Sequence, residues 1–287
     1  MGIKVENVFF TYNKKASNST LALNDVSFEI KDNEFVAIVG ETGSGKSTLA
    51  QTFNALLVPD KGEVKVDDFV ISYKNRKSKK LKGLRKHIGL VFQFPEYQLF
   101  EETVDKDVAF GPKNFGLKGE EALKRAHEAL AKVGLDESYY KRPPFELSGG
   151  ERRKVAIAGI LAIDPDILIF DEPTVGFDPA SAKELMNLIT EFHKNGKTII
   201  VITHDMDLVN RYAQKVFLLE KGKLVFEGSP HDLFMFVRGY DRLDIPQVIK
   251  LALALKDKGI DIDIDNIRHS DDLINEIKKW RAKKWLV

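Results

Sequence analysis

The sequence contains no cysteine among its 287 residues. Disulfides and thiolate metal sites are therefore excluded, and the absence fits a reducing compartment. The chain begins without the charged segment, apolar run and cleavage site of a secreted protein, so we expect it not to be secreted. Its apolar runs, such as 198–203, are far shorter than the roughly 20 residues that a membrane-spanning helix needs. We therefore expect a cytosolic chain that serves any membrane through partners.

The sequence also lacks an excess of charge of either sign. Lys and Arg number 44 and Asp and Glu number 43, which gives a formal net charge of +1. No overall field therefore attracts nucleic acid or acidic lipid, and we expect no nucleic-acid partner. The one dense basic run, 74–82, is interpreted as a solvated surface loop.

What the sequence does have is the alternation of an α/β fold. Short β-branched runs alternate with helix-period segments, which predicts a mostly parallel core sheet covered by helices. The predicted buried strands are 35–39, 88–92, 167–170 and 198–202. The predicted helices are 46–57, 119–133 and 148–162.

Two further regions adjoin this core. Alternating segments predict a flanking antiparallel β-subdomain. These segments are 5–11, 26–30 and 64–66. A helical subdomain is expected at about 94–162. After Pro230 the composition changes to two amphipathic helices, 246–256 and 271–283, so we place a boundary near Ser229 and expect domains at 1–229 and 230–287.

The sharpest motif is a glycine-rich loop between a predicted strand and a predicted helix. It runs Gly40, Glu41, Thr42, Gly43, Ser44, Gly45, Lys46, Ser47, Thr48. Backbone N–H groups of such a loop converge on phosphate oxygens, Lys46 neutralises the β and γ phosphates, and Ser47 offers a hydroxyl to Mg²⁺. The alternative, a glycine-rich turn with an incidental lysine, is disfavoured by the strand–loop–helix context.

Two carboxylates end another predicted strand. Asp171 and Glu172 follow 167–170 and should lie at the carboxyl edge of the sheet, where α/β folds bind ligands. We expect Asp171 to orient Mg²⁺ and Glu172 to polarise the attacking water. His204 follows 198–202 and is expected at the same edge, in contact with the γ-phosphate. A solvated turn and a helix-flanking histidine are the alternatives.

Further motifs give these residues a family. Leu147-Ser148-Gly149-Gly150-Glu151 resembles the signature of ABC transporter ATPases, and the resemblance covers about residues 3–229. The remaining motif residues, in chain order, are Tyr12, Gln93, Asp171, Glu172, Asp178 and His204. The resemblance implies a P-loop NTPase ABC cassette that uses ATP and Mg²⁺.

The resemblance also implies a role for each remaining motif. The signature residues Ser148, Gly149, Gly150 and Glu151 would bind the ATP held by a second cassette. Tyr12 would stack on adenine, and Asp178 would bridge the cassettes. Gln93 would sense Mg²⁺, take part in catalysis and couple the site to the membrane partner. Glu151 replaces the common glutamine and Phe177 the common leucine, and both should tune the interface. Ser148 also precedes two glycines at a predicted helix start, where an anion can bind. This chain supplies no phosphate to that position, so we expect a second subunit to supply one and the protein to form a dimer.

A narrower resemblance concerns the segment after Gln93. Residues 92–100, 101–104 and 107–112 look like the energy-coupling factor ATPases, most of all the second of their two ATPase subunits. This implies two unlike ATPases, a transmembrane coupling protein, a substrate-binding membrane protein contacted indirectly, and cargo of vitamins or transition-metal ions. The chain would lie peripherally on the cytoplasmic face of the cell membrane.

The resemblance also implies where the partners bind. The coupling protein would contact 94–100, whose aromatic and proline side chains suit a groove for a partner helix; ordinary core packing is the alternative. The C-terminal helices would hold the two ATPases together, as heterodimer or homodimer.

Two rival functions remain at this stage. One is the ATPase of a conventional ABC importer, and the other is a soluble ABC ATPase that acts on nucleic acid or ribosomes. A single cassette with near-neutral charge disfavours the second rival. Purification from membranes, with identification of the accompanying proteins, separates the three functions.

The phosphate-loop assignment predicts that Lys46→Ala abolishes ATP turnover, because the β and γ phosphates lose their neutralising charge. The measurement is phosphate release by the purified protein. Undiminished hydrolysis by this variant contradicts the assignment.

Overall fold

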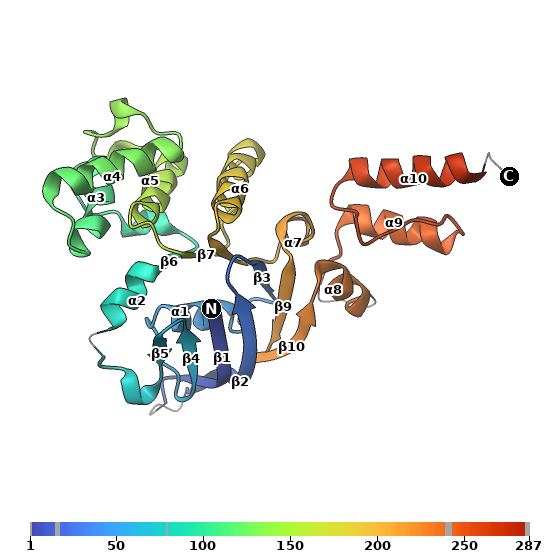
Figure 1. The fold of residues 1–287 in the computed structure, drawn as a ribbon, viewed down its shortest axis with the longest axis horizontal. Coiled ribbons are helices and arrows are strands. Elements are labelled where there is room, and N and C mark those ends of the chain that lie inside the picture. The colour runs from blue at the N-terminus through green and yellow to red at the C-terminus, as the bar shows by residue number, and fades with distance from the viewer. Residues whose placement is uncertain (1, 15–17, 79, 239–242, 285–287) are drawn as a thin grey trace.

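The computed structural model describes residues 2–14, 18–78, 80–238 and 243–284, and within them the chain forms two β-sheets with attached helices (Figure 1). The strands are β1 (Gly2–Tyr12), β2 (Thr20–Lys31), β3 (Phe35–Val39), β4 (Lys61–Val66), β5 (Phe69–Ile71), β6 (Ile88–Val91), β7 (Ile167–Asp171), β8 (Thr198–Ile202), β9 (Lys215–Glu220) and β10 (Lys223–Gly228). The helices are α1 (Lys46–Phe53), α2 (Leu81–His87), α3 (Val104–Asn114), α4 (Gly119–Lys132), α5 (Gly149–Leu161), α6 (Pro179–Lys194), α7 (Met206–Tyr212), α8 (Pro230–Phe236), α9 (Gln247–Asp257) and α10 (Ser270–Lys284). Short 3₁₀ helices are η1 (Tyr73–Asn75), η2 (Pro95–Gln98), η3 (Glu137–Tyr139) and η4 (Pro144–Glu146).

The larger sheet has the strand order β10-β9-β3-β8-β7-β6, and the pairings are parallel except that of β9 with β10. Both of its faces are covered. In β7, Ile167 and Ile169 pack into the cluster on one face, while Leu168 and Phe170 pack into the cluster on the other. Such strands read as continuous apolar runs in the sequence. The expectation of a mostly parallel core sheet is confirmed.

The smaller sheet is antiparallel, with the order β2-β1-β4-β5, as expected for the flanking subdomain. Helix α1 joins the two sheets, because its Leu49 and Phe53 are fully buried in a cluster that draws side chains from both. The ring of Phe53 meets Phe28 of β2 edge to face at 6.4 Å. The phosphate loop that precedes α1 is therefore anchored to both sheets.

Helix α1 is shorter than predicted. The sequence pattern extended it to residue 57, whereas it ends at Phe53. Ala55 adopts a left-handed conformation with φ of 55°, which brings the Leu57 N–H to the Gln51 carbonyl at 3.0 Å and closes the helix end. The apolar residues after Phe53 kept the helical period but lie outside the helix.

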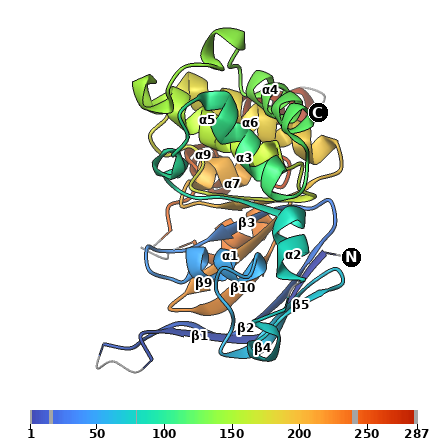
Figure 2. The ribbon, with the colours of Figure 1, turned by 90° about the vertical axis from the view of Figure 1, so that its left-hand side faces the viewer.

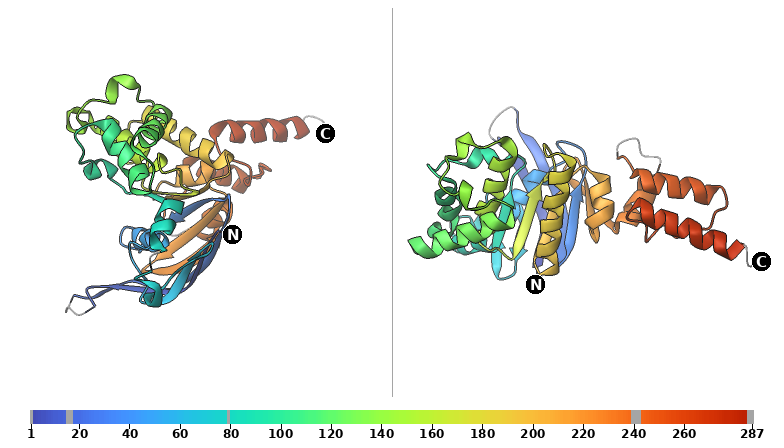
Figure 3. Two further views of the ribbon diagram at one scale, coloured as in Figure 1. Left: turned by 60° about the vertical axis from the view of Figure 1, so that its left-hand side comes forward. Right: turned by 90° about the horizontal axis from the view of Figure 1, so that it is seen from above.

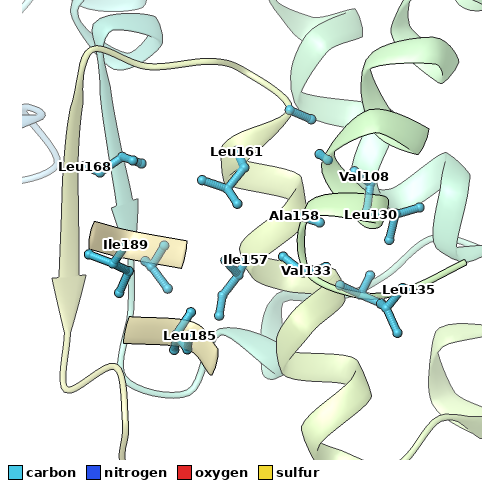
Figure 4. Packing of buried hydrophobic residues seen from close by; sticks show 14 of the residues in the cluster. Val108, Leu130, Val133, Leu135, Ile157, Ala158, Leu161, Leu168, Leu185 and Ile189 are labelled. Carbon is cyan, nitrogen blue, oxygen red and sulfur yellow. The ribbon is translucent and has the colours of Figure 1, made fainter. Parts of the chain in front are cut away.

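Helices α3, α4 and α5 form a group that lies above both sheets in Figure 2. Its apolar side chains meet the large sheet and α6 (Figure 4). Ile157 and Leu161 of α5 face Leu185 and Ile189 of α6 and Leu168 of β7. The bounds of about 94–162 for a helical subdomain remain a prediction.

Helices α9 and α10 lie at the opposite end of the molecule from this group (Figure 3). Their buried side chains share an apolar cluster with β9 and α8. Within α10, Leu273 is buried while Ile274 is 47% exposed, and Leu251 of α9 is 54% exposed. The domain boundary and the dimerisation role of this region remain predictions.

We expect Phe53→Ala to lower the free energy of unfolding by about 3–5 kcal/mol, because it leaves a cavity between the two sheets. Chemical denaturation of the purified chain measures the change. Leu56→Ala is the matched control, since Leu56 is 47% exposed and its loss should change stability by no more than about 0.5 kcal/mol. Equal stabilities of the two variants would contradict this account of how the sheets are joined.

Candidate active site

The glycine-rich loop runs from the end of β3 to the start of α1, as predicted. Two of its glycines are required by space. A Cβ on Gly40 would lie 2.2 Å from the Leu219 carbonyl oxygen, and one on Gly45 would lie 2.5 Å from the Ala22 carbonyl oxygen. Both residues also have positive φ, of 143° and 104°. The loop therefore lies so close to β2 and β9 that only glycine fits at positions 40 and 45.

Lys46, the first residue of α1, folds back over this loop. Its Nζ donates to the carbonyls of Gly40 at 2.7 Å and Glu41 at 2.8 Å. Burial lowers the pKa of Lys46, and the nearby charges of Glu172 and Asp171 act against that shift. The Ser44 hydroxyl is also buried and has no hydrogen-bond partner among the described residues. The loop thus holds a cation and a hydroxyl donor that an anionic ligand could engage.

Asp171 ends β7 and hydrogen bonds to the Ser47 side chain. Burial raises the pKa of Asp171, while the Ser47 hydrogen bond and the Lys46 charge lower it. A carboxylate and a hydroxyl are both oxygen ligands, the kind that Mg²⁺ prefers. The donor set therefore fits the predicted magnesium site.

Glu172, the next residue, is held in a defined position. Its Oε2 accepts from the Thr203 hydroxyl at 3.1 Å, and its Oε1 lies 2.7 Å from His204 Nδ1. Its φ is 50°, an uncommon value for a residue other than glycine, and its N–H donates to the Ile202 carbonyl at 2.8 Å. The ends of β7 and β8 therefore meet as the sequence predicted, and Thr203 is a further contact that the motif pattern did not identify.

Tyr12 lies at the end of β1 next to the start of α1. Its hydroxyl is 3.2 Å from Thr48 Oγ1, and its ring meets Phe10 edge to face at 4.9 Å. The side chain remains 37% exposed. An aromatic face beside the phosphate loop suits the stacking role predicted for it.

The signature lies on the helical group rather than at the phosphate loop. Ser148 caps α5, with its Oγ accepting from the Glu151 N–H at 3.3 Å. Glu151 completes a capping box by accepting from the Ser148 N–H at 2.8 Å, and it also accepts from the Tyr139 hydroxyl at 2.9 Å. Hydrogen bonds from Ser148 and Tyr139 lower the pKa of Glu151. No described hydrogen bond or ion pair joins the signature to the phosphate loop.

Gln93 and Asp178 are exposed and lie apart from these contacts. Gln93 follows β6, and Asp178 caps α6 by accepting from the Ala180 N–H at 3.0 Å and the Ser181 N–H at 3.1 Å. Hydrogen bonds from Ser181 lower the pKa of Asp178. One chain thus brings Tyr12, the loop, Asp171, Glu172 and His204 together, while Gln93, Asp178 and the signature lie outside these contacts.

Comparison with known proteins agrees with this geometry. Residues 23–175 match the protein family described as ABC transporter. The chain is 51% identical over 262 residues, 91% of its length and 94% of the relative's, to the energy-coupling factor transporter ATP-binding protein EcfA2 of Streptococcus pneumoniae. It is 50% identical to the protein of the same name from Streptococcus thermophilus, over 90% of this chain and 93% of that one.

Solved structures resemble it as well. CbiO1 of Clostridium perfringens, described as part of the ABC transporter complex cbiONQ, is 39% identical with a TM-score of 0.71, over 90% of this chain and 96% of that one. The dimeric ATP-binding cassette MJ0796 in a post-hydrolysis state bound to ADP and Pi is 34% identical with a TM-score of 0.71, over 79% and 98% of the two chains.

The loop geometry predicts that Gly45→Ala weakens ATP binding about tenfold or more, because a clash with the Ala22 carbonyl moves the loop. A loss of only about 1.4 kcal/mol in binding free energy already raises Kd tenfold. Isothermal titration with ATP measures it. Gly159→Ala in α5 is the control, because open space surrounds a Cβ there and φ is not positive. Equal affinities of the two variants would refute the requirement for glycine.

Proposed function

This chain belongs to the ATP-binding subunits of energy-coupling factor transporters, which are ABC-type ATPases, and we propose that it hydrolyses ATP in composite sites shared with a second ATPase subunit. The observation that carries the proposal is the separation of its two half-sites. The phosphate loop and both carboxylates lie together, whereas the signature faces outward from α5. A second cassette would bring its own signature to this phosphate loop.

The first half-site binds the triphosphate and the metal ion. Residues 40–48 surround the phosphates with backbone N–H groups, and Lys46 exchanges its two loop carbonyls for phosphate oxygens. Ser47 and Asp171 would hold Mg²⁺, with Gln93 added from the neighbouring strand end. The bound Mg²⁺ would neutralise charge that develops on the phosphates. Tyr12 stacks on the adenine.

Glu172 acts as the general base in this half-site. Hydrogen bonds from Thr203 and His204 fix its carboxylate at the carboxyl edge of the sheet, where it orients a water for in-line attack on the γ-phosphate. The His204 side chain is 70% exposed, so its other ring nitrogen is accessible to the γ-phosphate. The proton of the attacking water passes to Glu172.

The second half-site acts on ATP bound to the other subunit. Ser148 Oγ accepts from the Glu151 N–H, and its O–H, which hydrogen bonds to the Glu151 carboxylate in this chain, would turn to donate to a phosphate oxygen. Gly149 and Gly150 leave the α5 N-terminus open, since a Cβ on either would meet no atom within 4 Å. Asp178 lies at another exposed helix start and would bridge the subunits. The pair is a heterodimer, with a homodimer as the alternative.

The segment 94–100 would bind the transmembrane coupling protein. Phe94, Tyr97 and Phe100 are 43%, 83% and 57% exposed, while Pro95 and Leu99 are buried and hold the segment in place. These exposed rings support the partner-groove interpretation over ordinary core packing. Within the described ranges, no helix has the length and apolar character to cross a membrane. As in the family, the subunit would act from the cytoplasmic face of the membrane, and a separate membrane protein, contacted only indirectly, would bind the vitamins or transition-metal ions.

We expect Glu172→Gln to retain ATP binding while the hydrolysis rate falls at least about a hundredfold, because the amide cannot accept the proton of the attacking water. ATP should then hold the two ATPase subunits together, and size-exclusion chromatography with and without MgATP detects the pair. Phosphate release measures the rate.

The control changes the signature. Ser148→Arg in this chain should abolish the site that contains the partner's phosphate loop while leaving ATP binding by this chain intact. Wild-type hydrolysis by Glu172→Gln removes Glu172 from the role of base. Two results would refute the composite site. One is a full rate of ATP hydrolysis by this chain without a partner, and the other is a full rate at both ATP sites of a pair that contains Ser148→Arg.

A further inference from the structure

Arg153 of α5 lies two residues after the signature, and its side chain is only 7% exposed. Its guanidinium makes a two-pronged ion pair with Glu96 of η2, through Nε to Oε2 at 3.1 Å and through Nη2 to Oε1 at 2.9 Å. The third nitrogen, Nη1, donates to the backbone carbonyl of Val175. One buried cation therefore joins three segments that are distant in the sequence.

Each of the two outer segments supplies a hydrogen-bond acceptor and an aromatic ring. The centroid of the Phe94 ring lies 5.6 Å from the guanidinium carbon, and that of Phe177 lies 5.0 Å from it. Gly176 allows this approach, since a Cβ there would lie 3.1 Å from Nη1. Arginine beside aromatic rings and a carboxylate is held by its planar shape as well as by its charge.

Val175 belongs to the loop that connects Glu172 to Asp178. Its N–H donates to the Glu172 carbonyl at 3.3 Å, and the Phe177 N–H donates to the Thr174 carbonyl at 3.2 Å. These two successive turns leave little freedom between the ends of the loop. The position of the Val175 carbonyl therefore affects the positions of both Glu172 and Asp178.

Glu96 belongs to the segment that carries the exposed rings of Phe94 and Tyr97. Burial raises the pKa of Glu96, but the hydrogen bonds and charge of Arg153 outweigh that effect and the pKa is lowered. A buried ion pair that loses one partner leaves an uncompensated charge. Glu96 and Arg153 therefore move together when η2 moves.

We propose that Arg153 is a positioning residue that couples η2 to the loop 172–178, so that displacement of η2 by a membrane protein shifts Glu172 and Asp178 relative to bound ATP. The inference rests on the proposed function, because it takes 94–100 as the contact with the membrane protein. It adds a physical link between that contact and the reaction centre.

The test uses the complete transporter, with the second ATPase subunit and the membrane proteins, and measures kcat and KM for ATP. We expect Arg153→Lys to lower kcat about ten- to a hundredfold with KM changed less than about twofold, because one ammonium cannot hold Glu96 and Val175 together and small displacements in an active site have effects of this size. If Arg153 supplied only a positive charge for stability, lysine would replace it and kcat would stay at the wild-type value. The matched control is Arg125→Lys, since Arg125 is 46% exposed and its nearest carboxylate, on Asp164, lies 3.7 Å away.

A double-mutant cycle tests the route. Glu96→Gln should also lower kcat, and combining it with Arg153→Lys should lower kcat no further than the more severe single variant does. Wild-type kcat for Arg153→Lys, or losses that multiply in the double variant, would overturn the inference. If Arg153→Lys does not assemble, Glu96→Gln and Gly176→Ala provide the same test against Arg125→Lys.

Glu172→Gln in the same complex separates the two levels of the proposal. If Glu172→Gln is inactive while Arg153→Lys behaves as wild type, only the inference about Arg153 fails. If Glu172→Gln hydrolyses ATP at the wild-type rate, the proposed function of the reaction centre fails.

Discussion

At the edge of the large sheet where β3, β7 and β8 end, one ammonium and two carboxylates share a partly buried space. Burial lowers the pKa of Lys46 and raises that of Asp171. The charges of the two carboxylates act against the shift of Lys46, and the Lys46 charge acts against the shift of Asp171, whereas the Glu172 charge adds to the latter. In this chain Lys46 donates to two loop carbonyls rather than to a carboxylate, so phosphate oxygens can replace its present partners. The surrounding fold, from the glycines of the loop to the strained backbone of Glu172, keeps these three groups within reach of one another.

Much of this arrangement could be predicted from the sequence, because parallel topology brings the carboxyl ends of strands to one edge. The residues after β3, β7 and β8 could be placed together once their apolar runs were identified. The end of α1 could not be predicted, since the left-handed turn at Ala55 carries no glycine to mark it. The hydrogen bond from the Tyr139 hydroxyl to Glu151 could not be predicted from the sequence either, because it depends on how η3 packs against α5.

The contacts of Arg153 are a further feature that the sequence does not predict. An arginine on a helix is usually solvated, and nothing in the local pattern distinguishes Arg153 from its neighbour Arg152. Its partners Glu96 and Val175 lie 57 and 22 residues away along the chain. Only the packing of the helical group against the large sheet brings them together. Motifs identify the groups that are proposed to touch the nucleotide, whereas the residues that hold those groups in position are found only in the tertiary structure.

The N-terminus of α5 bears on the proposal of a shared reaction centre. In this chain the N-terminus of α5 is already satisfied by its own Glu151, whose carboxylate caps the Ser148 N–H. A phosphate from another subunit would therefore meet a helix start whose partial positive charge is partly compensated. What remains available is the open backbone at Gly149 and Gly150, together with a Ser148 O–H that would have to turn away from the Glu151 carboxylate. Closure of the proposed pair would thus depend on short-range hydrogen bonds from these groups more than on long-range attraction. Such bonds form only when the donor and acceptor are correctly aligned, which would tie hydrolysis to the relative position of the two subunits.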